Sequence, residues 1–178
     1  MIAEVQTAGK WGQFIELWNA SDSPWVPGDK MYIAADVIGD PSPHYVWASG
    51  DHGVGFTLPP WRRLLLVAPG WTGPAADAVM SSEIPHAGSI RLVFWSGAPT
   101  AHDKLCIYTN AAEETALSAP GLTPVCLGKP AYNPLDGRSL ERGPGGQAGN
   151  CLNGVTSAAT GYVLSSENPQ GLDAPATW

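Results

Sequence analysis

Charged residues are scarce in this chain, and cations are the scarcest of them. Only 14% of its 178 residues are Asp, Glu, Lys or Arg, against roughly a quarter in an average globular protein. Nine cations face 16 acidic residues, which gives a formal net charge of −7. A chain so poor in Lys and Arg is not suited to electrostatic capture of nucleic acid or of an anionic membrane. Nucleic acid is therefore not an expected partner.

Long apolar runs are missing as well. No stretch approaches the roughly 18 consecutive apolar residues of a membrane span, so direct membrane insertion is not expected. The opening segment, MIAEVQTAGK, lacks the basic and apolar regions of a signal peptide. The sequence leaves open whether Met1 is a native start or follows a removed leader.

Cysteines number only three, at Cys106, Cys126 and Cys151. Their spacing fits no zinc or Cys-x-x-Cys redox pattern. A disulfide between Cys126 and Cys151 would close a loop worth roughly 3.5 kcal/mol on the chain-entropy model. That pairing is the candidate bridge, and it leaves Cys106 free or paired with another chain. Three buried free cysteines are the alternative.

Motifs of catalysis and metal binding are missing too. The chain has no Gly-x-Ser-x-Gly elbow, no His-Glu-x-x-His and no phosphate-binding glycine loop. We therefore expect no enzyme, and no catalytic, cofactor-binding or metal-ligating residues. The pairs Asp51-His52 and His102-Asp103 are adjacent in sequence, so in extended backbone their side chains point apart. His44 and His86 are likewise expected to be solvated loop residues.

A calcium ion held in loops is the one cofactor alternative, although the EF-hand spacing is absent. Its candidate ligands are Asp36, Asp40 and Asp51.

Glycine, proline and tryptophan are plentiful. The chain holds 21 Gly, 17 Pro and eight Trp, and 44% of its residues are hydrophobic. This composition opposes long helices and disorder, and it suits short strands joined by many turns. Short alternating or apolar segments indeed recur between turns, and they predict strands at residues 1–6, 13–19, 31–38, 45–47, 63–68, 89–95 and 104–108.

The remaining segments predict little regular structure. Residues 69–88 are expected to form a loop, and residues 109–121 hold the only helix-like stretch. From about residue 122 the pattern fades into an irregular C-terminal tail. The fold class is therefore all-β, an antiparallel β-sandwich with an irregular tail. We expect one domain over 1–178, with a core at about 1–110 and a wrapping segment at about 111–178.

Aromatic residues suggest a binding surface. In Gln13–Asn19, Ile15 and Leu17 share one face while the remaining aromatic and acidic side chains share the other. Aromatics on one sheet face can stack on sugar rings or anchor a protein contact. The candidate surface comprises Phe14, Glu16, Trp18, Trp61 and Trp71. The alternative is that these rings fill or cover the core.

Basic residues are expected to be structural. Arg142 lies beside Glu141, and an ion pair that pins the tail is favoured over an anion site.

Several motifs, taken in order, resemble the lamin tail domain family. Ala3-Glu4-Val5 followed by Glu16-Leu17-Trp18-Asn19-Ala20-Ser21 is similar to its first hairpin. Phe56-Thr57-Leu58-Pro59-Pro60 is similar to the family's Phe-x-Leu-x-x-Gly strand entry, with Trp61 in place of the glycine. That replacement predicts a turn built differently. Gly88–Leu92 with Asp103–Tyr108 resembles the closing hairpin, and Gly137–Arg142 resembles the Ser-Leu-Glu-Arg segment of bacterial members.

The resemblance implies an immunoglobulin-like sandwich without catalytic residues, of the exported bacterial type. Its expected location is extracellular or at the cell surface. Its expected work is protein–protein adhesion or assembly, with another protein or a subunit of a surface assembly as partner. A carbohydrate-binding module that holds polysaccharide on exposed Trp, and a phage or virion surface subunit, remain alternatives.

Overall fold

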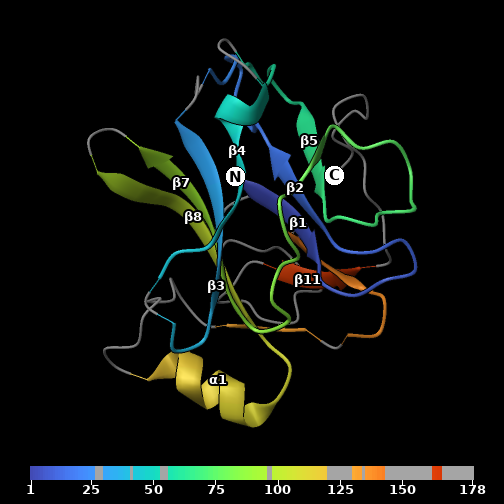
Figure 1. Ribbon diagram of the computed structural model, residues 1–178, viewed down its shortest axis with the longest axis vertical. Helices are drawn as coiled ribbons and strands as arrows, with labels where there is room; N and C mark the ends of the chain where they lie inside the picture. Colours follow the sequence, from blue (N-terminus) through green and yellow to red (C-terminus); the bar gives the residue numbers. More distant parts are fainter. Residues whose placement is uncertain are drawn as a thin grey trace.

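The computed structural model describes residues 1–26, 30–40, 42–52, 56–95, 98–119, 130–133, 135–142 and 162–165. Within these residues, eleven strands form two sheets that face each other (Figure 1). The predicted all-β, immunoglobulin-like sandwich is therefore confirmed.

Each sheet combines strands from distant parts of the chain. The six-stranded sheet has the order β11 (Tyr162–Ser165), β10 (Ser139–Arg142), β1 (Ile2–Gln6), β2 (Phe14–Trp18), β5 (Arg63–Val67) and β6 (Ala78–Val79). The five-stranded sheet has the order β4 (Tyr45–Ala48), β3 (Met31–Val37), β7 (Gly88–Trp95), β8 (Pro99–Tyr108) and β9 (Ala131–Tyr132). A short 3-10 helix, η1 (Ser49–His52), follows β4.

Strand alternation decides which side chains enter the core. Ile15 and Leu17 of β2 belong to the main apolar cluster between the sheets, as do Met31, Ile33 and Ala35 of β3. Successive side chains point to opposite faces of a strand, so the intervening residues point away from this core. The predicted face assignment of residues 13–19 is correct.

All seven predicted strands are present, but the predicted loop and tail contain further ones. β6 lies within the expected loop, and β9, β10 and β11 lie within the expected irregular tail. Ser139–Arg142 pairs with β1 on one side and β11 on the other. The prediction of an irregular tail is therefore wrong for these three segments, and the rest of the tail lies outside the described residues.

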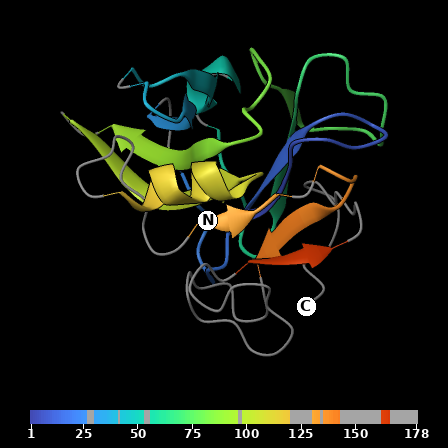
Figure 2. The ribbon, with the colours of Figure 1, turned by 90° about the horizontal axis from the view of Figure 1, so that it is seen from below.

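Two pairings also depart from the expected antiparallel arrangement. β5 with β6 and β8 with β9 are parallel. A parallel pair needs a long connection that returns the chain to the same end of the sheet. The helix α1 (Ala111–Ser118) lies in the second of these connections and contacts β8, as Figure 2 shows from below. Among the described residues, no helix is long and apolar enough to cross a membrane.

A buried ion pair joins the two sheets. The Arg142 guanidinium on β10 donates to both carboxylate oxygens of Asp103 on β8, at 2.8 and 2.7 Å. The same Asp103 accepts the backbone N–H of Ile2 at 2.7 Å, and Arg142 Nε donates to the Ile2 carbonyl at 2.8 Å. Arg142 thus has the predicted structural role, but its ionic partner is Asp103 rather than Glu141.

Cys106 lies on β8, is buried, and is disulfide-bonded. The candidate bridge between Cys126 and Cys151 stays a prediction. Cys126 and Cys151 lie outside the described residues.

Candidate functional site

The candidate aromatic surface is largely buried. Phe14 and Glu16 are fully buried and Trp18 is 7% exposed, whereas Trp61 is 47% exposed and Trp71 is half-buried. These residues do lie on the outer face of the six-stranded sheet, as the alternation predicts. A contact surface needs accessible side chains, so the assignment of Phe14, Glu16 and Trp18 to it is wrong.

A second, smaller apolar cluster covers this outer face. Phe14 packs with Leu65 and Val67 of β5, and Trp71 and Ala76 close over them. The Phe14 and Trp71 rings meet edge to face with their centroids 5.9 Å apart. The segment that follows β5 therefore folds back over β2. Sequence alternation gave the face of β2 but carried no signal that this loop would cover it.

Charged side chains are buried beside this cluster. Glu16 of β2 pairs with Arg63 of the neighbouring strand β5, diagonally across the register in which Arg63 lies opposite Trp18, and both side chains are fully buried. The Arg63 guanidinium also lies over the Trp18 ring, 5.9 Å from its centroid. Glu16 therefore neutralises a buried cation and is not available to a ligand.

Glu4 on β1 is a strongly perturbed acid. It is fully buried, and the Ser139 hydroxyl of β10 donates to its Oε1. Burial raises the pKa of Glu4 from 4.5 to about 9, against the opposing effect of the Ser139 hydrogen bond; the neighbouring charges of Glu16 and Glu141 raise it further. At neutral pH the Glu4 side chain is therefore a neutral carboxylic acid.

Trp61 stands out because an exposed indole occupies a position that suits glycine. The Arg62 N–H donates to the Pro59 carbonyl at 3.3 Å, which closes a turn with Pro60 and Trp61 at its centre. Trp61 has a φ of 58°, and a turn with proline second and positive φ third is of type II. Positive φ costs a non-glycine residue about 1–2 kcal/mol. The turn therefore keeps a glycine-like backbone, contrary to the expectation that Trp61 would change it.

Neighbouring residues fix the Trp61 ring. Its indole N–H donates to Asp22 Oδ1 at 3.0 Å, and its centroid lies 6.0 Å from that of Trp18. The Asn19 carbonyl accepts the Trp61 backbone N–H at 2.9 Å. An exposed aromatic ring is thus held in one orientation by a carboxylate, a second ring and the backbone. We call the exposed pair Trp61 and Asp22 the Trp61 platform; the buried Trp18 ring supports it and is not part of it.

Tryptophan rings in the described residues do not form a flat surface. Trp18 and Trp61 are inclined at 50°, and Trp11 and Trp71 at 65°. A carbohydrate module of the kind considered above needs two or three coplanar exposed rings. These two pairs do not provide them.

The aspartates considered for calcium are engaged with basic side chains. Arg91 Nε donates to Asp36 Oδ2 at 2.6 Å, and the His44 ring contacts Asp40 Oδ2 at 3.0 Å. This hydrogen bond from His44 lowers the pKa of Asp40. The side chain of Asp51 lies outside the described residues. In the part of the chain that the structure describes, no three His, Cys, Asp or Glu side chains form a metal-binding group.

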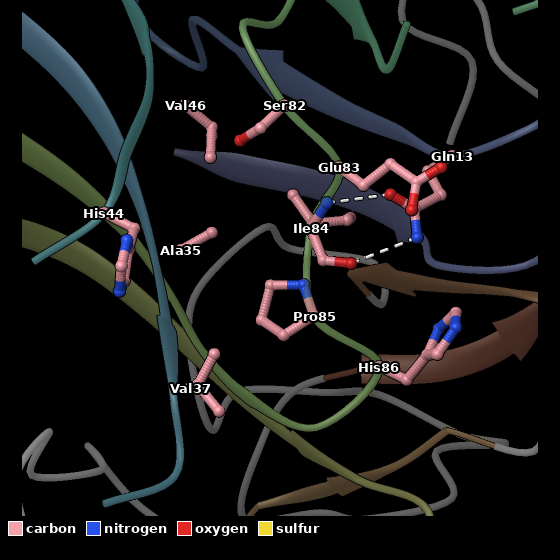
Figure 3. Close-up of a pocket in the computed structure, with 10 residues that line it drawn as sticks. All are labelled: Gln13, Ala35, Val37, His44, Val46, Ser82, Glu83, Ile84, Pro85 and His86. Carbon is pink, nitrogen blue, oxygen red and sulfur yellow. Dashed lines mark hydrogen bonds between the residues drawn. The ribbon is translucent and has the colours of Figure 1, made fainter. Parts of the chain in front are cut away.

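A pocket of about 400 Å³ opens where the two sheets separate (Figure 3). One wall consists of Ala35 and Val37 of β3 with Val46 of β4. The opposite wall is the segment from Ser82 to His86, which connects β6 to β7 and lies within the predicted loop.

Hydrogen bonds hold this second wall in place from both sides. Gln13 donates to the Ile84 carbonyl at 3.0 Å and accepts the Ile84 N–H at 2.7 Å, as the dashed lines in Figure 3 show. Gln13 also donates to the Thr7 carbonyl at 2.9 Å. On the other side, the Ser81 N–H donates to the Val46 carbonyl at 2.7 Å. The pocket is therefore preformed, and nothing in the irregular sequence of residues 80–87 predicted it.

The fold and these features define an all-β sandwich with a strained, exposed tryptophan and a small pocket. No protein-family model matches the chain. No curated protein and no solved structure matches it either.

Proposed function

We propose that this chain is a non-enzymatic, immunoglobulin-like binding module of the lamin tail type, and that it contacts another protein through the Trp61 platform. The observation that carries the proposal is the combination of backbone strain and exposure at Trp61. A strained conformation that persists at an exposed side chain points to a function for that side chain. Tryptophan is also the residue most enriched at the energetic centres of protein interfaces.

The glycine-like backbone of Trp61 also supports the family resemblance. The family motif has glycine at this position, and this chain adopts a backbone conformation that glycine reaches without strain. The tilt between the Trp18 and Trp61 rings favours protein over a flat polysaccharide as the partner.

Trp61→Gly and Trp61→Ala form a matched pair that separates the ring from the backbone. Both remove the indole, but only alanine retains the cost of positive φ. We expect the free energy of unfolding measured by urea titration to be about 1 kcal/mol higher for the glycine variant than for the alanine variant. We expect both variants to lose the partner equally, because the partner contacts the ring.

A photo-crosslinking amino acid at Ser23, an exposed residue next to Asp22, tests the contact in the cells that make the protein. One protein adduct of discrete mass is expected, and an adduct of twice the chain mass would identify a second copy as the partner. The adduct should disappear in both Trp61 variants and should not form from exposed Val79 on β6. An adduct that survives both variants contradicts the proposal. If soluble polysaccharide shifted the tryptophan fluorescence and both variants lost this shift, the ligand of the platform would be carbohydrate and not protein.

We further propose that the module works outside the cell or at the cell surface. The disulfide at Cys106 supports this location, because disulfides persist in oxidising compartments. The protein should be fractionated from its own cells without reductant and alkylated. Intact mass spectrometry is then expected to find one alkylated thiol among three cysteines. Three alkylated thiols in a cytoplasmic fraction would rule out export.

A further inference from the structure

The pocket between Val37 and Ile84 exposes a residue that strand alternation assigns to the core. Met31, Ile33, Ala35 and Val37 occupy alternate positions of β3, and the first three are buried between the sheets. Val37 is instead 48% exposed and lines the pocket. Val37 is therefore open to solvent at this end of β3, whereas Ala35, Val46 and Ile84 beside it are buried. An apolar group placed here would extend the core and would gain the free energy of leaving water.

One carboxylate, that of Glu83, and two histidine rings, those of His44 and His86, line the pocket. Asp40 contacts His44 on the rim, where the two histidines lie on opposite sides in Figure 3. None of the ten described lining residues is Lys or Arg. A bound cation would face the Glu83 carboxylate, whose charge is opposite to its own, whereas a bound anion would be repelled by it.

We infer that this pocket binds a small organic amine, with its apolar body against Val37 and Pro85 and its ammonium group toward Glu83. A volume of about 400 Å³ lies at the small end of the range for small-molecule sites. Both walls are fixed by the hydrogen bonds of Gln13 and Ser81, so binding does not have to order the pocket first. This site uses none of the residues of the Trp61 platform and does not rest on the function proposed for it.

Three probes of equal shape separate the charge from the apolar contribution: phenethylamine, phenethyl alcohol and phenylacetate. Methyl NMR shifts of Val37, Val46 and Ile84 report binding in the pocket. We expect phenethylamine to bind with a Kd on the order of 1 mM, which is ordinary for a ligand of this size. We expect the alcohol to bind several-fold more weakly and phenylacetate to cause no shift.

Two variants test the role of charge. Glu83→Gln should weaken the binding of phenethylamine by roughly threefold to fivefold, the range of an exposed ion pair. It should leave the affinity for phenethyl alcohol unchanged. Glu114→Gln makes an equal change of charge on α1, and it should alter the affinity for neither phenethylamine nor phenethyl alcohol. Val37→Lys places a cation in the pocket, so it should abolish amine binding and permit phenylacetate.

Other outcomes overturn the inference. Equal binding of all three probes would mean that the pocket does not select a cation. Shifts outside the pocket, or none at all, would mean that it is not a site. A lysine-containing tripeptide that binds at least tenfold more tightly than phenethylamine would assign the pocket to a peptide side chain instead of a free amine. Failure of these probes would leave the crosslink at the Trp61 platform unaffected.

Discussion

Arg142→Ala is expected to destabilise the protein by about 3–5 kcal/mol, the usual cost of removing one partner from a buried ion pair. The side chain of Arg142 is 2% exposed and that of Asp103 is 10% exposed. Without the guanidinium, Asp103 would stay in the interior as a charge stabilised by the backbone N–H groups of Ile2 and Lys104 and by the charge of the Met1 ammonium. Because the pair links β10 to β8, its loss also removes a contact between the two sheets.

Urea titration at pH 7 measures this loss, and Arg138→Ala supplies the control. Arg138 forms the same type of ion pair with Asp136 at 2.7 Å, four residues before Arg142, but both side chains are nearly half exposed. An exposed pair contributes little to stability, so the Arg138 variant should keep the wild-type midpoint. Adding Asp103→Asn to Arg142→Ala should recover part of the loss by removing the buried charge. Equal midpoints for Arg142→Ala and Arg138→Ala would show that the pair contributes nothing.

The sequence predicted the sandwich because the signals for it are local. Alternation over β2, β3 and β7 places apolar residues on one face, and Gly/Pro-rich segments separate the strands. Those strands suffice to define two apolar faces that must pack together. The short strands β6 and β9 have only two residues each, so neither could show a period. Their positions depend on the connections that bring them beside β5 and β8.

The candidate surface could be predicted only in part, for a related reason. Alternation correctly placed Phe14, Glu16 and Trp18 on one face, but it could not show that β5 and the loop after it would bury that face. The sequence also offered Glu141 as the nearest partner of Arg142. In a strand, neighbouring side chains point to opposite faces, and the actual partner lies 39 residues away on the other sheet. Long-range pairings of this kind leave no mark in one sequence.

Trp61 gave a local signal of another kind. A tryptophan after two prolines, where the resembling family has glycine, indicated an unusual turn. The signal correctly identified the position and wrongly predicted a different backbone. Trp61 has a φ of 58°, a conformation that glycine reaches without strain, so the turn exposes an indole on a glycine-like backbone.

Glu4 is expected to make the protein less stable as the pH rises from about 4.5 to about 9. The pKa of Glu4 is raised from 4.5 to about 9 by burial. Between these values the native state binds a proton that the unfolded state has released. Stability is therefore fully present below pH 4.5 and is lost as the pH rises toward 9, with a slope of up to about 1.4 kcal/mol per pH unit from this one group.

Glu4→Gln should remove this contribution, because the amide has the same shape and does not titrate. The cost of burying the amide is independent of pH, so it cancels when slopes are compared. Urea titrations from pH 5 to pH 8.5 should show that the stability of the variant relative to wild type rises by about 1 kcal/mol per pH unit. Other groups titrate in both proteins and do not affect this difference.

Glu83→Gln is the matched control, since it removes a carboxyl group from an exposed position. It should reproduce the wild-type dependence on pH, whereas Glu4→Gln should not. If the free energy of unfolding changed with pH in the same way in the wild type and in Glu4→Gln, Glu4 would be ionised in the folded protein. The outer face of the six-stranded sheet would then hold the charges of both Glu4 and Glu16 against Arg63. In that case Arg63→Met should destabilise the wild type more than it destabilises the Glu4 variant, because two buried carboxylates would lose their cation.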